Sequence, residues 1–244
     1  NIIDSDGLLR LKSIPRSIIV YGAGVIGVEY ATMLKALDID ITLINEKNRM
    51  LPFIDYDVMD EFSHHLRKSG VRIMLGEKLE NVRRTDTGEV EIRLKSGRSV
   101  IADVMLFTAG RTGCTDSLKL ENIGLRATDR HHIVVNENFQ TDIPHVYAAG
   151  DLIGFPSLAS TSMEQGRVAA CHAFGESCNN TPEHFPHGIY SIPEISIIGI
   201  TEQELVVKGV AFEVGIARLQ DTARGQIMGL GEGLLKLLVD IKDH

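Results

Sequence analysis

Residues 20–31, VYGAGVIGVEYA, decide the fold. Gly22, Gly24 and Gly27 form the spacing Gly-x-Gly-x-x-Gly directly after an apolar run, SIIV, that is typical of a buried parallel strand. In a strand–turn–helix unit the first glycine permits the tight turn, the second lets the backbone approach a pyrophosphate, and the third lets helix and strand pack closely. The N–H groups at the helix start then face the phosphates. Glycines also serve packing alone, but this motif follows a strand and opens a helix, and that setting predicts dinucleotide binding.

The residues that follow extend this unit into alternating helices and strands. A helix is expected over 25–38 and a second strand over 39–44. A second helix over 55–69, ending at Gly70, and a third strand over 71–75 continue the alternation. The first helix carries apolar residues at helical spacing: Ile26, Tyr30, Met33, Leu34 and Leu37.

The pattern changes after the third strand. Residues 80–110 alternate between polar and apolar side chains, with turn signals at DTG and SG, and end in the apolar run VMLFTAG. This predicts an antiparallel meander that leads into a further buried strand. Together with the preceding βαβ unit it forms one doubly wound, Rossmann-like α/β domain, expected over 15–115. Residues 1–14, which are broken by Asp and Gly and followed by Pro15, are expected to be a linker.

Shorter elements are expected beyond this domain. Residues 132–151 suggest two short strands, and a helix begins near Ser157, a suitable N-cap residue. Residues 188–199 suggest one strand with Pro193 inside it, which favours an edge position or a bulge.

The last stretch of the chain carries a clear helix start. Thr201 and Glu204 have capping-box spacing, and Gly209 closes this helix. Two strands, AFEVGIA and GLLKLLVD, follow. The sequence stops at VDIKDH directly after a strand, which would leave that strand unpaired. The chain is therefore expected to be a piece of a longer protein.

The composition excludes several classes of protein. With 244 residues, 43% hydrophobic and 24% charged, the chain can bury a real core. Its net charge of −8 argues against nucleic-acid binding, and no apolar run is long enough to span a membrane. The three cysteines, Cys114, Cys171 and Cys178, are too sparse for a disulfide framework and suit the reducing cytoplasm.

The charged loop NEKNR after the second strand bears on the choice of nucleotide. A dinucleotide-binding unit usually has an acid here for the adenosine ribose. Asn45 is instead neutral and can both donate and accept. Lys47 and Arg49 can approach a 2′-phosphate, while Glu46 can still accept from a hydroxyl; a solvated charged turn explains the two cations as well. Nothing in this loop rejects either NAD or NADP.

Two acidic residues have both a plain and a functional explanation. Glu29 lies in the first turns of the helix after the glycines, where a solvated glutamate near the positive helix end is equally reasonable. Asp151, in the run YAAGD, can bind a ribose or ribitol hydroxyl, although Gly-Asp is also common in turns. Both assignments depend on the segments around them.

Four segments, taken in chain order, resemble the two-dinucleotide-binding flavoproteins of the pyridine nucleotide-disulfide oxidoreductase family. They are YGAGVIGVEYA, FTAGRTG, TDIPHVYAAGD and SLASTSMEQGR, and their combination is far more specific than any one alone. Finer details, such as LIN at the ribose position, GIYSIPEISIIG and TARGQI, are similar to the transhydrogenase members of the family. The resemblance covers nearly the whole chain, but the chain corresponds to about the middle half of such a protein.

The resemblance implies residues that contact the nicotinamide dinucleotide. Glu29 matches the catalytic glutamate beside the nicotinamide, whose lysine partner lies outside this chain. Gly110 lies near the same end of the ligand. Val25 stands where some relatives carry a gating tyrosine. The remaining nucleotide-binding positions are Gly22, Gly24, Val25, Ile26 and Gly27 at the pyrophosphate and Asn45, Glu46 and Arg49 at the adenosine ribose.

The resemblance also implies a flavin site and a domain order. Asp151 is similar to the ligand of the FAD ribitol, and Ala159 opens a helix directed at the flavin pyrimidine. After the NAD(P)-binding domain, residues 116–181 would form the C-terminal part of an FAD-binding domain. Residues 182–244 would begin an α+β interface domain. No metal site is expected.

The activity implied is hydride transfer between NAD(H) and NADP(H) through FAD, in a homodimer when the protein is intact. The family's redox Cys-x4-Cys and His-x4-Glu pairs are absent from this chain, and its cysteines are interpreted as core or surface thiols. Two alternatives stay open: a disulfide reductase similar to dihydrolipoyl dehydrogenase, and a nucleotide-binding module without activity of its own.

Overall fold

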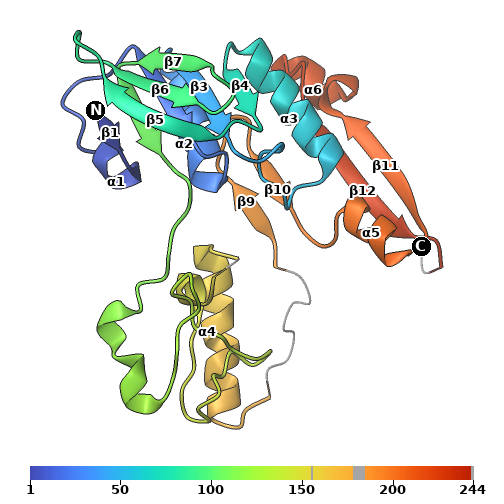
Figure 1. The fold of residues 1–244 in the computed structure, drawn as a ribbon. Coiled ribbons are helices and arrows are strands. Elements are labelled where there is room, and N and C mark those ends of the chain that lie inside the picture. The colour runs from blue at the N-terminus through green and yellow to red at the C-terminus, as the bar shows by residue number, and fades with distance from the viewer. Residues whose placement is uncertain (155, 178–184, 243–244) are drawn as a thin grey trace. The chain divides into compact units, whose positions relative to one another are not determined.

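The computed structural model describes residues 1–154, 156–177 and 185–242 (Figure 1). They form two compact units, and the C-terminal strands belong to the same unit as the glycine motif. Unit 1 consists of Asn1–Gly110, Ile189–Ile195 and the chain from Ile200 onward, and unit 2 of the described parts of Arg111–Gly188 together with Ser196–Gly199.

A five-stranded parallel sheet forms the centre of unit 1 (Figure 1). The strand order puts β2 in the middle, and its residues are apolar on both faces because both faces are covered. The mixed α/β fold with a parallel sheet is therefore confirmed. In order across the sheet, the strands are β1 (Ile2–Ile3), β8 (Val104–Phe107), β2 (Ser17–Tyr21), β3 (Asp40–Asn45) and β4 (Arg72–Leu75).

A second, antiparallel sheet packs on one face of the first (Figure 1). Side chains alternate between the faces of a strand, so Ile19 and Ile44 point to this side. They share a core with Ile92 and Leu94, and all four are 0% exposed. The three strands, joined in sequence, are β5 (Leu79–Arg84), β6 (Val90–Leu94) and β7 (Ser99–Ala102).

The helix α2 (Val25–Ala36) packs on the parallel sheet with small residues rather than with its large apolar ones. Its buried residues are Gly27, Val28, Ala31 and Thr32. The expected apolar stripe is wrong in part, because Met33 is 38% and Leu37 63% exposed. Small side chains let the helix axis come close to β2 and β3, which leaves the longer ones at its flanks. The other helices of this region are α1 (Ser5–Leu8) and α3 (Tyr56–Lys68).

The segment expected to be a linker contributes to the sheet. Ile2 and Ile3 pair in parallel with Met105 and Leu106 of β8, and α1 follows with Asp4 as its N-cap. A two-residue strand is too short to show a period-2 pattern, so no sequence pattern indicated it.

Unit 2 contains one long helix and little other regular structure. The helix α4 (Ala159–Ala173) begins after Leu158, so Ser157 is not its N-cap as expected. The two strands expected within 132–151 do not form; the described chain there has only isolated bridges, from Ala127 to Ile133 and from Gln140 to Tyr147. The described residues of this unit also form three short 3₁₀ helices: η1 (Asp116–Leu118), η2 (Leu120–Ile123) and η3 (Gly150–Ile153).

Residues 188–199 also differ from the expectation. In place of one strand there are two, β9 (His187–Ile189) and β10 (Ile195–Ile197), which form a two-stranded sheet. Pro193 lies between them, since proline has no N–H to give to a ladder. The expected domain boundary at 181–182 lies outside the described residues.

The C-terminal elements follow the sequence closely. The helix α5 (Glu202–Lys208) has the expected capping box between Thr201 and Glu204 and ends at Gly209, with φ 66°. The strands β11 (Phe212–Arg218) and β12 (Leu234–Asp240) pair over their whole length, so the last strand is not unpaired as expected. Between them lie η4 (Leu219–Asp221) and α6 (Ala223–Met228).

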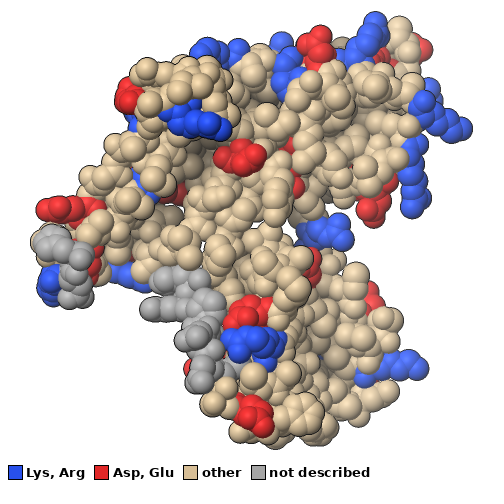
Figure 2. All heavy atoms as spheres, turned by 180° about the vertical axis from the view of Figure 1, so that it is seen from behind, with Lys and Arg blue, Asp and Glu red and all other residues tan. Residues whose placement is uncertain are grey.

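Charged side chains are scattered over the face drawn in Figure 2, where acidic and basic groups lie among a larger uncharged surface. Among the described helices, none is both long enough and apolar enough to cross a membrane.

Candidate functional site

Protein packing constrains two of the three glycines after β2 and leaves the third unconstrained. A side-chain carbon at Gly22, where φ is +114°, would lie 2.5 Å from the carbonyl oxygen of Thr108. At Gly27 it would lie 1.9 Å from the carbonyl oxygen of Gly22. At Gly24 it would meet no protein atom within 4 Å. Packing therefore explains Gly22 and Gly27 but not Gly24, whose missing side chain leaves room for a ligand.

Gly24 is also the N-cap of α2, and no side chain caps this helix. The first N–H groups of a helix have no partner within the helix, and the helix dipole makes this end positive. Val25, Ile26 and Gly27 contribute those N–H groups. These are the N–H groups that the sequence analysis assigns to a pyrophosphate, and that assignment stays a prediction.

Asn45, the last residue of β3, joins the glycine turn to the loop that follows it. Its Oδ1 accepts from the N–H of Ala23 at 3.2 Å. Its Nδ2 donates to the carbonyls of Lys47 and Arg49 at 3.2 and 2.9 Å. Both amide protons are therefore used within the protein. Asn45 lies at the predicted place, but the structure gives it a role that the sequence did not indicate, since its partners depend on the loop conformation.

Glu46 is held by a buried tyrosine that the sequence analysis did not single out. Its Oε1 accepts from the hydroxyl of Tyr21 at 2.8 Å, and that hydroxyl accepts from the N–H of Leu79 at 3.0 Å. Burial raises the pKa of the Tyr21 phenol; the Leu79 bond lowers it and Glu46 raises it, for a net rise. The phenol therefore stays protonated and acts as the donor in its hydrogen bond to Glu46.

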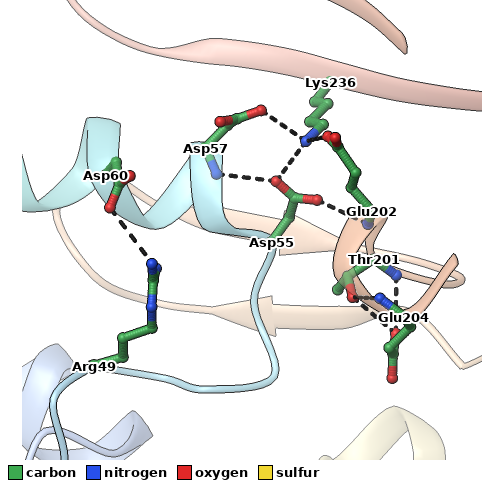
Figure 3. Close-up of polar contacts among 8 residues, drawn as sticks. All are labelled: Arg49, Asp55, Asp57, Asp60, Thr201, Glu202, Glu204 and Lys236. Atoms are coloured by element: carbon green, nitrogen blue, oxygen red, sulfur yellow. Dashed lines mark hydrogen bonds and ion pairs between the residues drawn. The ribbon is translucent and has the colours of Figure 1, made fainter. Parts of the chain in front are cut away.

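Arg49 turns toward α3. Its guanidinium lies 3.5 Å from the ring centroid of Tyr56, a cation–π contact. It also lies 3.9 Å from Oδ1 of Asp60, a pair that Figure 3 shows. Of the two cations expected near a 2′-phosphate, Arg49 is thus already engaged.

Glu29 is engaged as well, through the backbone of a distant segment of unit 1. Its Oε1 accepts from the N–H of Tyr190 at 2.8 Å, and one turn later Thr32 Oγ1 accepts from the N–H of Ile192 at 3.0 Å. Thr32 is 3% exposed. No local pattern could have indicated these bonds, because the partners are 160 or more positions apart in the chain.

Lys236 of β12 forms the centre of a second polar cluster in unit 1 (Figure 3). Its ammonium group binds Asp55 at 2.8 Å, Asp57 at 2.7 Å and Glu202, while its side chain is only 4% exposed. Burial alone would lower the pKa of Lys236, but the three carboxylates raise it to a net value above normal. The cluster joins the starts of α3 and α5 to β12.

The flavin-site residues implied by the resemblance lie in or beside unit 2. Asp151 is exposed on η3, and Ala159 is the first residue of α4. The buried amide of Gln165 links α4 to η3, because its Oε1 accepts from the N–H of Gly150 at 2.7 Å. Gly110, which the resemblance implies near the nicotinamide, is the last residue of the first segment of unit 1; its φ is +134° and a side-chain carbon there would meet open space.

One buried polar atom in this region lacks a protein partner. Thr161, in the first turn of α4, is 1% exposed, and its Oγ1 has no hydrogen-bond partner within the described chain. Buried hydroxyl groups are normally hydrogen-bonded. The first turn of α4 therefore fits a polar cofactor group, in agreement with the flavin position that the resemblance implies.

The cysteines and acidic residues offer no further centre among the described residues. Cys114 is exposed, Cys171 is half-buried, and both are free thiols. Cys178 lies outside the described residues. In the described part of the chain, no group of three or more His, Cys, Asp or Glu residues could hold a metal ion.

Comparison with known proteins shows the family. A model described as pyridine nucleotide-disulphide oxidoreductase matches residues 1–166, and the dimerisation domain of the same family matches residues 185–244. The chain belongs to the pyridine nucleotide-disulphide oxidoreductase family. The resemblance stated from the four segments is thus confirmed.

Two curated members of this family illustrate the similarity. The soluble pyridine nucleotide transhydrogenase of Mycobacterium bovis (strain BCG / Pasteur 1173P2) is 48% identical over 242 residues, which are 99% of this chain and 52% of that protein. The enzyme of the same name from Salmonella paratyphi B is 48% identical over 238 residues, 97% of this chain and 51% of that protein. The chain therefore spans about half the length of the curated relatives it matches.

Solved structures of the family share the fold. The HOCl-induced flavoprotein disulfide reductase RclA from Escherichia coli matches with a TM-score of 0.88 at 28% identity, over 98% of this chain and 55% of that one. LpdA from Mycobacterium tuberculosis matches with a TM-score of 0.89 at 27% identity, over 98% and 52%.

Proposed function

We propose that the chain is the central part of a cytoplasmic, FAD-dependent oxidoreductase that transfers hydride between NAD(H) and NADP(H). Unit 1 would bind the nicotinamide dinucleotide through a Rossmann-like domain corresponding to residues 15–115. Residues 116–181 would complete an FAD-binding domain. Residues 182–244 would begin the α+β interface domain of a homodimer, to which the dimerisation match over 185–244 lends support.

The observation that carries the proposal is the open position at Gly24. Protein packing requires its two neighbours in the motif, whereas the space beside Gly24 is free and lies at an uncapped helix start. A pyrophosphate that approaches the backbone explains both facts. The similarity to transhydrogenases at 48% identity supports the choice of reaction.

The chain's own residues would orient the reactants. The start of α2 would hold the dinucleotide by its phosphates, and Glu29 and Gly110 would lie toward the nicotinamide. Asp151, Thr161 and the N–H groups at the start of α4 would hold parts of FAD. When bound, FAD would supply the ring that accepts hydride from one nicotinamide and gives it to the other. No acid or base of this chain is required for that transfer.

A disulfide reductase is the second candidate, because the solved relative RclA is named as one. The two candidates differ in their need for a redox-active cysteine pair. Reduction of the intact protein with one equivalent of NADPH, followed by thiol titration, separates them: two new thiols indicate a disulfide reductase, and none indicates a transhydrogenase.

Replacing Gly24 with alanine is expected to weaken both nicotinamide dinucleotides by about tenfold or more, because a methyl group occupies the approach of the pyrophosphate. The free energy of unfolding should change by no more than about 1 kcal/mol, because the methyl group meets no protein atom. The remaining effect on stability is that alanine is a poorer N-cap residue than glycine. Calorimetric titration with NADH and NADPH, together with thermal unfolding, measures both effects.

Gly166→Ala is the matched control, because Gly166 lies in α4 and a side-chain carbon there also meets open space. Its affinity for the nucleotides should equal that of the wild type. If Gly24→Ala binds both nucleotides as tightly as Gly166→Ala does, the pyrophosphate does not lie at Gly24.

A further inference from the structure

Ala23, between the first two glycines of the motif, has both of its backbone polar groups fixed from outside the turn. Its N–H donates to Asn45 Oδ1 at 3.2 Å, and its carbonyl accepts from the N–H of Leu51 at 3.1 Å. A peptide unit is planar and trans, so its N–H points opposite to its carbonyl. The carbonyl of Ala23 and the N–H of Gly24 belong to one peptide unit. The bond from Leu51 therefore sets the direction of the Gly24 N–H at the start of α2.

Leu51 is held in a backbone conformation that leucine disfavours. Its φ is +40°, in the left-handed region, where a side-chain carbon crowds the backbone. Its side chain is 0% exposed, so the residue cannot relax by turning into solvent. A residue in such a conformation persists only where its surroundings fix it. Whatever fixes Leu51 therefore also fixes the Ala23 carbonyl and the glycine turn.

The connection from Leu51 to Asp55 is short and stiff. Pro52 follows Leu51, and its ring fixes its own φ. The N–H of Ile54, a residue that is 1% exposed, donates to the carbonyl of Leu51 at 2.9 Å. Asp55 comes next and is the N-cap of α3. A displacement of Asp55 would therefore be passed on to Leu51, because no flexible loop lies between them to absorb it.

Asp55 is itself held by residues far away in the chain (Figure 3). Its Oδ1 accepts from the ammonium group of Lys236 at 2.8 Å, and its Oδ2 accepts from the N–H of Glu202 at 3.0 Å. The backbone of Lys236 is fixed in turn, because it pairs with Ile216 in the two-stranded sheet of β11 and β12. Without the ammonium group, the Asp55 carboxylate would lie unpaired beside Asp57 and Glu202 and would turn toward water.

We propose that Lys236 is a positioning residue for the nucleotide site and acts on the glycine turn through Asp55 and Leu51. This inference rests on the proposed function. The ammonium group keeps Asp55 in place, Asp55 keeps Leu51 in its left-handed conformation, and the N–H of Leu51 keeps the Ala23 carbonyl in place. A strand close to the end of this chain thereby contributes to nucleotide affinity without touching the nucleotide. Because the glycine turn serves both nucleotides, the contribution does not depend on the 2′ substituent.

The test is calorimetric titration of the intact protein and its variants with NAD⁺ and NADP⁺, at a temperature where circular dichroism shows each variant to be folded. Lys236→Met should weaken both nucleotides by about fivefold or more, the range of coupling between separate sites. The ratio of the two affinities should stay within about twofold of the wild type. Lys236→Arg should restore most of the affinity, because it keeps a cation beside Asp55.

Ile92→Ala is the control for a loss of stability alone. It removes a side chain that is 0% exposed from β6 and should lower the urea midpoint of unfolding. The antiparallel sheet that contains Ile92 includes no residue of the path from Lys236 to Ala23. Nucleotide affinity in Ile92→Ala should therefore stay within about twofold of the wild type.

Asp55→Asn carries the test if Lys236→Met does not fold. It removes the charge that Lys236 holds and leaves no unpaired carboxylate at position 55, and it should also weaken both nucleotides. Wild-type affinity in the folded variant, Lys236→Met or in its place Asp55→Asn, would overturn the inference. An equal loss in Ile92→Ala would overturn it too, because the effect would then follow stability alone. If the wild type binds neither nucleotide, the proposed function itself fails.

Discussion

Replacing Gly27 with alanine is expected to lower the free energy of unfolding by about 3–5 kcal/mol, the largest effect of any single methyl group considered for this chain. The added carbon would lie 1.9 Å from the carbonyl oxygen of Gly22 and 2.7 Å from Oγ1 of Thr108. Neither atom can yield easily, because Gly22 is itself confined by Thr108 and the Thr108 hydroxyl donates to carbonyls of β2 and the turn. Urea unfolding followed by circular dichroism measures the loss.

Gly24→Ala supplies the comparison for this result. The two positions belong to one motif and receive the same methyl group, but only Gly27 has protein atoms in its way. Gly27→Ala should therefore lose stability, and Gly24→Ala should lose nucleotide affinity. A Gly27→Ala chain that unfolds at the same urea concentration as the wild type would show that α2 does not pack on the turn as described.

Replacing Lys236 with methionine is expected to cost about 3–5 kcal/mol, because it removes the counterion of a buried carboxylate. Asp55 is 7% exposed and would keep a negative charge beside Asp57 and Glu202. The pair of Lys68 with Glu232 provides the control: the Lys68 side chain is 67% exposed, against 4% for Lys236, and Lys68→Met should cost no more than about 1 kcal/mol. Equal losses in the two variants would mean that the Lys236 cluster is solvated.

The same cluster predicts how this loss depends on pH. Burial alone would raise the pKa of Asp55, but hydrogen bonds from Lys236, from the N–H of Glu202 and from the N–H of Asp57 hold it below 3.8. The pKa of Asp55 is lower in the folded than in the unfolded state. Its stabilisation is therefore fully present above pH 3.8 and is lost as the pH falls through the folded-state pKa. Lys236 has a raised pKa, so its contribution is complete below 10.5 and is lost only at higher pH.

Acid should therefore reduce the difference between the wild type and Lys236→Met. At neutral pH the buried Asp55 carboxylate is ionised and the difference is full. As the pH falls below 3.8, protonation of Asp55 removes the charge that needs a counterion. Urea unfolding of both chains across this range measures the change, and a difference that grows in acid would contradict the assignment.

Local patterns predicted the parts of the fold that depend on neighbours in sequence. The glycine motif, the strands β2 and β3 and the capping box at Thr201 each need only a few adjacent residues, and all were found where expected. The helix α2 shows the limit of this reasoning. Its apolar spacing pointed to Met33 and Leu37, but close approach to the sheet selected Ala31 and Thr32 for the buried face.

The places of the candidate residues in the secondary structure were predicted, but their hydrogen bonds were not. Asn45 and Glu29 lie where the sequence put them, at the end of β3 and in the first turns of α2. Their partners are set by tertiary structure: the glycine turn and the following loop for Asn45, and Tyr190 for Glu29. Lys236 lies 181 positions from Asp55, a separation at which charge patterns along the chain carry no information.

Glu29 and Thr32 accept hydrogen bonds from the N–H groups of Tyr190 and Ile192. These long-range bonds limit how the gene can be divided and recombined. A polypeptide that stops at Gly110 would keep both acceptors without their donors and would leave Asp55 without its ammonium group. The first 110 residues therefore depend on later parts of unit 1 and cannot be exchanged by themselves. A chimaera that exchanges them needs a segment that supplies the two backbone N–H groups at 190 and 192 and a lysine at position 236.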